Sequence, residues 1–312
     1  MKQKILITGG AGYIGSMLAT KLVDLGYEVH VIDKLVYSRD SLNHLFVKKN
    51  FFFHFEDVRN RKILKKLINK VDIIIPLAAL VGAPLCEKQP KLAIELNLDI
   101  IKFIVKNLKK NQKIIYPTSN SGYGVGEKNK FCDENSPLNP ISLYGRTKAD
   151  AEKEILKHKN SICFRLATVF GYSYRMRSDL LVNNLVYLSL KDKKLKIFEP
   201  HFRRNFIHIT DVVEAFVFAI KNFRLLKSNI YNLGLSSANI TKIQLVRKIK
   251  NQIKYLKIEV VKNRKDPDQR DYFVSNRKIE KKGFKAIVTL ESGINELTKY
   301  FTINKKKILN NY

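Results

Sequence analysis

The chain has 312 residues, of which 45% are hydrophobic, so it is long enough for one large α/β domain or two smaller domains with a buried core. Lysine and arginine total 58 against 28 acidic residues, a formal charge of +30. The basic residues are scattered rather than clustered, and no zinc-finger or RNA-binding signature occurs, which disfavours a nucleic-acid-binding protein. The charge would still steer an anionic small substrate toward the protein.

The cysteines and the N-terminus indicate a cellular compartment. Cys86, Cys132 and Cys163 are odd in number and lack metal-ligand spacing, which is typical of a reducing environment without a metal site. Residues 1–4 run straight into a short apolar strand instead of a signal peptide. Because no uncharged apolar run approaches ~20 residues, no membrane span is expected. The sequence therefore predicts a cytoplasmic protein that does not associate with membranes.

In the first half of the chain, apolar runs typical of buried strands alternate with amphipathic runs typical of helices. The expected strands are 4–8, 28–33, 71–79, 113–119 and 161–167. The expected helices are 15–26, 60–70, 91–110 and 146–158. This alternation predicts an α/β protein with a Rossmann-type, doubly wound parallel sheet.

After about residue 172 the alternation loosens into the short strands 195–198 and 205–209, the helix 211–222, and mixed helices and lysine-rich loops. We expect a smaller, C-terminal substrate-binding domain there. The predicted boundaries assign 1–171 and 204–235 to the cofactor-binding domain, and 172–203 and 236–312 to the smaller domain.

The stretch "KILITGGAGYIGSML" predicts a site for a dinucleotide. An apolar strand runs into Gly9, Gly10, Gly12 and Gly15, and a helix follows. Glycines permit the tight turn and the close approach of a pyrophosphate to backbone N–H groups, while the helix N-terminus adds partial positive charge.

Acidic residues at the next two strand ends extend this prediction. Asp33 can bind the ribose hydroxyls and would repel a 2′-phosphate, which favours NAD over NADP, although Lys34 next to it weakens the distinction. Asp57 and Val58 follow "FFFHFE", where they would lie near the adenine. Asp57 could equally cap the following helix.

Ser119, Tyr144 and Lys148 are the candidate catalytic residues. Ser119 ends the strand "KIIYPTS", and Tyr144 and Lys148 lie one turn apart on a predicted helix. A phenol has a pKa near about 10, and a neighbouring ammonium would lower it toward the range of a useful base. The serine hydroxyl could then hydrogen-bond the reacting oxygen. A second tyrosine–lysine pair, Tyr187 and Lys191, has no strand-end serine before it and is predicted to be non-catalytic.

Taken together, these motifs resemble the extended short-chain dehydrogenase/reductase family of nucleotide-sugar enzymes over essentially the whole chain. The matching stretches are "TGGAGYIGS", "DV" at 57–58, "PLAA" at 76–79, "SNSGYG", "YGRTK", "FRLATVFG" and "RRNFIHITDVV". The resemblance implies that Tyr144 is the base, that Lys148 binds the nicotinamide ribose, and that Ser119 polarises the substrate oxygen. It further implies a homodimer formed through helices at 91–110 and 144–158. The implied cofactor-binding residues are Gly9, Gly12, Tyr13, Ile14, Asp33, Asp57, Val58, Leu77, Ala78, Ala79, Tyr144 and Lys148.

Members of this family most often oxidise C4 of the sugar and differ in the next chemical step. The 4,6-dehydratases that this layout resembles carry Asp-Glu where this chain has Asn120 and Ser121, so dehydration lacks its acid. The cysteine of GDP-fucose-synthase-type enzymes is also absent there. A 4-epimerase, a 4-dehydrogenase or a 4-ketoreductase remains, and Asp33 disfavours the reductase because reductases often use NADP.

Several longer stretches narrow the resemblance to a subgroup that acts on GDP-heptoses as 4-dehydrogenases. They are "IIIPLAALVGAPLC", "SGYGVGEK", "RMRSDLLVN", "HFRRNFIH", "LGLSSANITK" and "DPDQRDYFVSN". This resemblance implies a GDP-linked nucleoside-diphosphate sugar as substrate and a 4-keto heptose as product, for surface-polysaccharide (capsule) synthesis. A 4-epimerase of the UDP-glucose/galactose type and a non-catalytic nucleotide-binding regulator are the alternatives.

Candidate substrate-binding residues lie outside the sheet. Arg204 precedes a strand at a position where the family commonly binds diphosphate, and a guanidinium matches a diphosphate with two parallel hydrogen bonds. The other candidates are Val81, Gly82, Ser121, Arg177, Asn183 and Arg270. Each arginine could equally be a solvated surface residue, and His208 is predicted to be a core residue.

Overall fold

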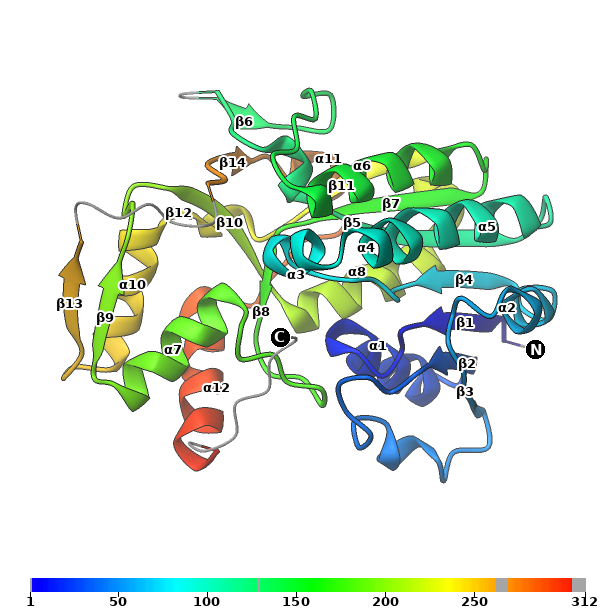
Figure 1. The fold of residues 1–312 in the computed structure, drawn as a ribbon, viewed down its shortest axis with the longest axis horizontal. Coiled ribbons are helices and arrows are strands. Elements are labelled where there is room, and N and C mark those ends of the chain that lie inside the picture. The colour runs from blue at the N-terminus through cyan, green and yellow to red at the C-terminus, as the bar shows by residue number, and fades with distance from the viewer. Residues whose placement is uncertain (1, 128–129, 262–268, 305–312) are drawn as a thin grey trace.

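A seven-stranded parallel sheet forms the larger part of the computed structural model, which describes residues 2–127, 130–261 and 269–304 (Figure 1). Its strands follow the order β3-β2-β1-β4-β5-β7-β11, and each pairs in parallel with its neighbours. They are β1 (Lys4–Thr8), β2 (Glu28–Asp33), β3 (Phe51–Phe55), β4 (Ile73–Pro76), β5 (Lys113–Ser119), β7 (Ser161–Leu166) and β11 (Asn229–Leu233).

Helices cover both faces of this sheet. One core contains Ile5 and Ile7 of β1 together with α1 and α8, whereas Leu6 between them belongs to the core with α2, α5 and α6. Alternate residues of a buried strand thus reach opposite faces, which explains its unbroken apolar run. The predicted Rossmann-type fold is confirmed. The covering helices are α1 (Tyr13–Asp24), α2 (Arg61–Ile68), α5 (Ile100–Asn107), α6 (Leu143–Leu156) and α8 (Ile209–Lys221).

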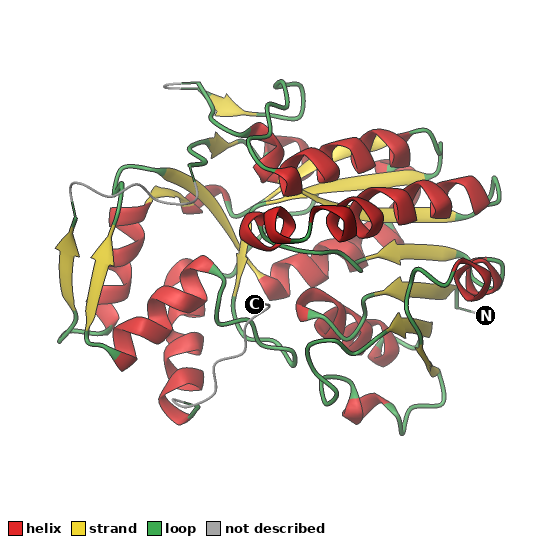
Figure 2. Cartoon of the chain, viewed as in Figure 1, coloured by secondary structure: helices red, strands yellow, loops and turns green. Residues whose placement is uncertain are grey.

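A smaller lobe packs beside the main sheet (Figure 2). Its helices α7 (Leu181–Lys191), α10 (Lys242–Gln252) and α12 (Leu290–Ile303) contact one another. Its three short sheets are formed by β8 (Thr168–Phe170), β10 (Arg203–His208) and β12 (Asn239–Thr241), by β9 (Lys194–Ile197) and β13 (Lys257–Val260), and by β6 (Phe131–Cys132) and β14 (Phe273–Val274). Of the predicted smaller domain, residues 262–268 and 305–312 lie outside the described residues.

Two segments differ from their sequence prediction. We expected 204–235 to rejoin the main sheet; α8 and β11 do so, whereas β10 pairs with β8 and β12. The helix expected at 91–110 consists of three parts, because a π-helical turn at Glu95–Asp99 interrupts it. The segments that flank this turn are α4 (Pro90–Ile94) and α5.

Three further short α-helices lie outside the segments described above. They are α3 (Ala83–Lys88), α9 (Phe223–Leu226) and α11 (Arg277–Glu280).

The strand order places the carboxyl ends of β1 and β4 at a topological switch point, because the chain crosses to opposite sides of β1 there. Ligands of doubly wound sheets bind in the crevice outside such ends. Within the described residues, no helix has the length and apolar character needed to cross a bilayer.

Candidate active site

A cavity of about 1320 Å³ opens at the carboxyl ends of the main strands and is closed on its other side by residues of the smaller lobe. Nearly all the residues predicted from the sequence line it. They are Gly9, Gly12, Tyr13, Ile14, Asp33, Asp57, Val58, Leu77, Ala78, Ala79, Val81, Gly82, Ser119, Ser121, Tyr144, Lys148, Arg177, Arg204 and Arg270. One cavity therefore contains both the predicted cofactor residues and the predicted catalytic residues.

The glycine loop between β1 and α1 fits a dinucleotide pyrophosphate. Gly9 has φ +70°, and a Cβ there would lie 2.6 Å from the backbone nitrogen of Ala78. A Cβ on Gly15 would lie 2.4 Å from the carbonyl oxygen of Gly9, so only glycine permits this packing. No side chain caps α1 at Gly12, which leaves the N–H groups of its first turn for an anion in the cavity.

The carboxylate of Asp33 is fixed beside this loop. Its two oxygens accept hydrogen bonds from the backbone nitrogens of Ala11 (2.9 Å) and Leu35 (2.8 Å). Burial raises the pKa of Asp33, and the backbone donors oppose that rise. A carboxylate held at the end of β2 can bind ribose hydroxyls, as NAD requires.

Lys34 and Asp57 form an ion pair. The ammonium of Lys34 donates to Asp57 Oδ2 over 3.1 Å, and Arg59 donates to the same carboxylate over 2.8 Å. The Arg59 guanidinium holds the pKa of Asp57 well below its usual range. The ammonium of Lys34 thus has an acidic partner of its own beside the predicted ribose site. The helix that follows is capped by Asn60, whose side chain accepts from the backbone nitrogen of Ile63, so Asp57 is not the cap.

Helix α6 brings the candidate base into the cavity next to Ser119. The side chain of Ser142 caps α6 by accepting a hydrogen bond from the backbone nitrogen of Gly145 (3.2 Å), so the helix begins at Leu143. Tyr144 and Lys148 then lie one turn apart, and both line the cavity at the end of β5. Ser119 lies close enough to Tyr144 to lower its pKa by hydrogen bonding.

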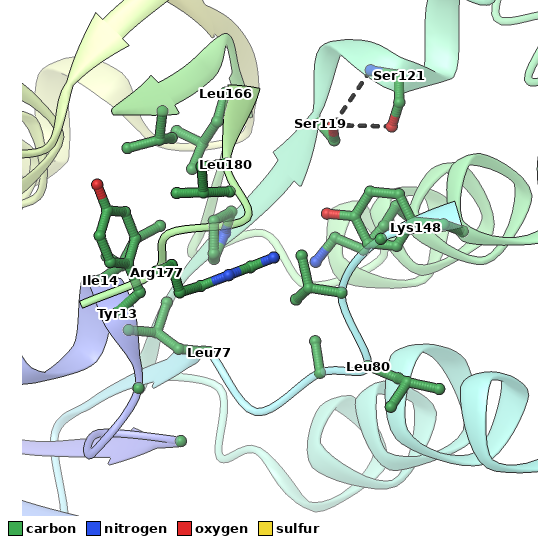
Figure 3. Close-up of a pocket in the computed structure, with 18 of the residues that line it drawn as sticks. Tyr13, Ile14, Leu77, Leu80, Ser119, Ser121, Lys148, Leu166, Arg177 and Leu180 are labelled. Carbon is green, nitrogen blue, oxygen red and sulfur yellow. Dashed lines mark hydrogen bonds between the residues drawn. The ribbon is translucent and has the colours of Figure 1, made fainter. Parts of the chain in front are cut away.

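Ser119 accepts hydrogen bonds and keeps its own proton available. Its Oγ accepts from the backbone nitrogen of Ser121 (3.1 Å) and from the Ser121 hydroxyl (2.8 Å), as Figure 3 shows. Ser119 can therefore donate its own proton, either to the oxygen of Tyr144 or to a substrate oxygen in the cavity. Asn120, between the two serines, is buried and does not line the cavity.

The electrostatics of Tyr144 differ from the sequence prediction. Burial raises the pKa of Tyr144, and the cations that oppose this rise are Arg270 and Arg177. The sequence predicted a lowered pKa for Tyr144, whereas burial raises it; Lys148 is itself buried, which lowers its own pKa to about 7. The Lys148 ammonium instead donates to the hydroxyl of Tyr116 over 2.7 Å.

Three predicted arginines bring positive charge to the cavity. Arg177 is buried, forms an ion pair with Asp179, and extends into the cavity in Figure 3. Arg204 on β10 is buried and donates to the carbonyl oxygen of Arg203 over 2.8 Å. Arg270 lies near Tyr144, and it follows residues 262–268, which are outside the described part of the chain. This set can bind a diphosphate.

Asn183 is the one predicted site residue that does not line the cavity. Its side chain is buried within α7, accepts from the backbone nitrogen of Gly171 (3.0 Å) and donates to the carbonyl oxygen of Arg177 (2.8 Å). It thus holds the segment that carries Arg177 instead of facing a ligand. The next residue, Asn184, lines the cavity instead, because neighbouring helix positions point in different directions.

The sequence prediction missed two residues that shape the site. Asn97, in the π-helical turn, binds the backbone of Leu80 through both amide atoms (2.8 and 3.0 Å) and so fixes the loop after β4. The sequence carries little signal for it, because Asn97 lies between Glu95 and Asp99 in "AIELNLDII" and only its burial sets it apart. Arg175 is buried over the ring of Tyr37, 4.7 Å from its centroid, and both line the cavity near Asp33. Its place in "RMR" beside Arg177 is its only sequence signal.

Comparisons with known proteins agree with this geometry. The NAD dependent epimerase/dehydratase family matches residues 5–234. The dTDP-D-glucose 4,6-dehydratase of Dictyostelium discoideum is 29% identical over 80% of this chain and 62% of that protein. The human dTDP-D-glucose 4,6-dehydratase is 27% identical over 97% of this chain and 91% of its own length.

A solved structure shares both fold and part of the sequence. The UDP-glucuronic acid 4-epimerase from Bacillus cereus, in complex with UDP-glucuronic acid and NAD, is 25% identical and has a TM-score of 0.83. The match covers 96% of this chain and 99% of that chain. The family match, the glycine loop and the Ser119–Tyr144–Lys148 cavity lead to one conclusion: this chain belongs to the NAD-dependent epimerase/dehydratase family, the nucleotide-sugar branch of the extended short-chain dehydrogenases/reductases, and is an enzyme with NAD as its cofactor.

Proposed function

We propose that the enzyme oxidises the C4 hydroxyl of a nucleotide sugar to a ketone. The observation that carries this proposal is that Ser119, Tyr144 and Lys148 line the same cavity as the glycine loop and Asp33. A candidate base, a hydrogen-bond donor and a dinucleotide site are thus within reach of one bound sugar.

In this proposal, Tyr144 as phenolate accepts the proton of the sugar hydroxyl, and Ser119 donates a hydrogen bond to the same oxygen. The glycine loop and Asp33 would hold NAD, which would supply the acceptor for the hydride that leaves the sugar carbon. Arg270 and Arg177 favour the phenolate, since each lowers the pKa of Tyr144. The alcohol therefore loses one proton and one hydride, and a ketone remains.

Dehydration is disfavoured because each lining carboxylate that the structure describes already has a partner. Asp33 binds backbone nitrogens, Asp57 binds Arg59, and Asp179 binds Arg177. Glu87 accepts from the backbone nitrogen of Leu143 at the start of α6. The position two residues after Ser119 is Ser121, which cannot serve as a carboxylic acid.

We propose a GDP-linked heptose, GDP-D-glycero-α-D-manno-heptose, as the substrate, oxidised for surface-polysaccharide synthesis. The support is the resemblance of the six longer stretches to a GDP-heptose 4-dehydrogenase subgroup. A 4-epimerase is the second candidate, and the similarity to the UDP-glucuronic acid 4-epimerase of Bacillus cereus supports it. The two differ in whether the ketone is released or reduced again on its other face.

For the nucleotide, we propose that Arg177, Arg204 and Arg270 bind the diphosphate and that the smaller lobe forms the nucleotide-sugar-binding domain. All three arginines line the cavity, and Arg177 and Arg204 are buried although charged. A buried guanidinium in a cavity can bind a diphosphate with well-oriented hydrogen bonds.

We also propose a homodimer through α5 and α6, which lie side by side on one face of the main sheet (Figure 1). The support is the family resemblance of these two segments. Sedimentation velocity of the purified protein would test it, and a monomer would contradict the proposal.

A substrate panel tests the proposed reaction. The protein is incubated with NAD and, separately, with the GDP-heptose, UDP-glucose, UDP-glucuronic acid or dTDP-glucose, and NADH and sugar products are measured by absorbance and NMR. Net NADH and a 4-keto heptose from the GDP-heptose alone support the dehydrogenase. Interconversion of C4 epimers without net NADH supports the epimerase. Loss of water from the sugar would contradict both.

A further inference from the structure

The ammonium of Lys148 is buried against one residue that the proposed oxidation does not use. Lys148 is 5% exposed, and its Nζ lies 2.7 Å from the hydroxyl of Tyr116 and 4.0 Å from the centroid of that ring. A buried ammonium is costly unless it is hydrogen-bonded. The phenol oxygen of Tyr116 therefore accepts a hydrogen bond from the Lys148 ammonium and stabilises the ammonium charge.

Other titratable groups also lie near Lys148, and Cys163, Glu152 and Cys86 favour its charged form. Glu152, one turn further along α6, forms an ion pair with Arg165 over 2.7 Å. The thiols of Cys86 on α3 and Cys163 on β7 have raised pKa values because they are buried, and so stay neutral at pH 7. The remaining titratable neighbour is Tyr144, whose pKa burial also raises.

Strand β5 holds Lys148 at two points. Tyr116 and Thr118 are alternate residues of β5 and face α6. The Thr118 hydroxyl donates to the backbone carbonyl of Lys148 over 3.4 Å, while Tyr116 accepts from its side chain. Backbone and ammonium are thus both fixed relative to Ser119, which ends the same strand. The ammonium retains further N–H donors for a ligand in the cavity.

We propose that Tyr116 is a positioning residue, which keeps the Lys148 ammonium charged and directed so that it can bind the ribose of the nicotinamide nucleotide. The proposal deepens the proposed function, on which it rests for the role of Lys148. The proposal predicts that the affinity for the nucleotide depends on pH. When Lys148 loses its proton, the positive charge and a hydrogen bond to the ribose are lost. Nucleotide affinity should therefore fall as pH rises through the pKa of Lys148.

The test compares Tyr116→Phe with Tyr231→Phe. Tyr231 is a matched control, because it is a fully buried tyrosine on β11 of the same sheet whose hydroxyl donates to the carbonyl oxygen of Leu226 over 3.2 Å. After copurifying nucleotide is removed with charcoal, the dissociation constant of NADH is measured by its fluorescence between about pH 5 and 9, a range that spans the pKa of Lys148, about 7.

We expect the wild type and Tyr231→Phe to share one midpoint, above which NADH binding weakens. In Tyr116→Phe the midpoint should fall by about 1 pH unit, because the charged ammonium loses its acceptor. In Lys148→Met the transition should disappear. An unchanged midpoint in Tyr116→Phe would overturn the proposal, as would a transition that persists in Lys148→Met.

Thermal unfolding of both tyrosine variants shows whether a loss of binding reflects loss of the fold. If Tyr116→Phe unfolds like Tyr231→Phe and keeps the wild-type midpoint of NADH binding, then Tyr116 has only a packing role. The readout contains no sugar, so its failure is distinct from failure of the proposed oxidation. If no nucleotide sugar is oxidised, the NADH midpoints still test Tyr116.

Discussion

Two helices carry a tyrosine four residues before a lysine, and the structure gives them different surroundings. In α6, Tyr144 lines the cavity and Lys148 is buried against the main sheet. In α7, Tyr187 is buried against Phe301 of α12, with ring centroids 5.3 Å apart, and Lys191 is exposed. The spacing places the pair on one helix face in both cases, but only α6 presents that face to a ligand cavity.

The difference comes from the element that precedes each helix. Helix α6 packs against β5, whose last residue is Ser119, at the carboxyl edge of the parallel sheet. Helix α7 follows the loop after β8 and packs against α12 and α10 in the smaller lobe. A tyrosine–lysine motif therefore indicates catalysis when a strand end of the main sheet supplies its partner, and substitutions in both helices can test this comparison.

The largest effect is expected for Tyr144→Phe. Loss of the base should reduce turnover of the sugar identified in the panel by about 10³-fold, because general-base catalysis is lost while the ring still fills its place. The matched control Tyr187→Phe removes the same oxygen from the other helix and should keep its rate. Initial rates of both variants decide this, and comparable activity in the two would refute the distinction between the helices.

A smaller loss is expected for Ser119→Ala. Removing the donor to the reacting oxygen should lower kcat by about 10²-fold with nearly unchanged nucleotide affinity. Ser189→Ala is the control, because that hydroxyl is buried in α7 and donates to the carbonyl oxygen of Leu185. Steady-state kinetics with the active sugar measure both. Equal kcat values in the two variants would exclude a catalytic hydroxyl at the end of β5.

A smaller change is expected for a substitution at the cofactor end of the cavity. Asp33→Asn should weaken NAD binding by about 10-fold and reduce the discrimination against NADP, since the charge that binds ribose hydroxyls is lost. Asp24→Asn, at the exposed end of α1, should bind like the wild type. Calorimetric titration with both dinucleotides measures this. Unchanged preference in Asp33→Asn would mean that Asp33 does not select NAD.

The smallest expected effect concerns stability against pH. Lys148 has a pKa of about 7 in the folded protein and 10.5 as its ordinary value, so between these values the unfolded chain binds the extra proton. This group therefore contributes an unfolding free energy that rises with pH across that window, by on the order of 1 kcal/mol between about pH 7 and 8.

Lys148→Met should remove that rise, whereas Lys191→Met, on the exposed side of α7, should keep it. Urea unfolding at both pH values measures the free energies. A rise that survives in Lys148→Met would show that other groups cause it.

Much of the site could be predicted because the sheet is parallel. Every strand of a doubly wound sheet ends at the same edge, so Gly9, Asp33 and Ser119, which follow or end three apolar runs, converge without any knowledge of packing. To place Tyr144 and Lys148 in the same cavity, only the direction of one helix had to be predicted in addition.

The remainder depends on packing that a local pattern does not contain. The rotation of α7 decides whether Asn183 or Asn184 faces the cavity, and this rotation is set by contacts with α12. Burial raises the pKa of Tyr144 against the opposing charge of the distant residues Arg270 and Arg177, and burial lowers the pKa of Lys148. These partners come together only in the folded chain.

Transfer of the C4 hydrogen tests the central claim most directly. The nucleotide sugar that the enzyme accepts is prepared with deuterium at C4, incubated with the protein and NAD, and both products are analysed by mass spectrometry and NMR. We predict deuterium on the nicotinamide, or returned to C4 of an epimerised sugar. Deuterium released to solvent would contradict hydride transfer from C4, and deuterium at C6 of a sugar that has lost water would show that C4 oxidation leads to dehydration, contrary to the proposed reaction.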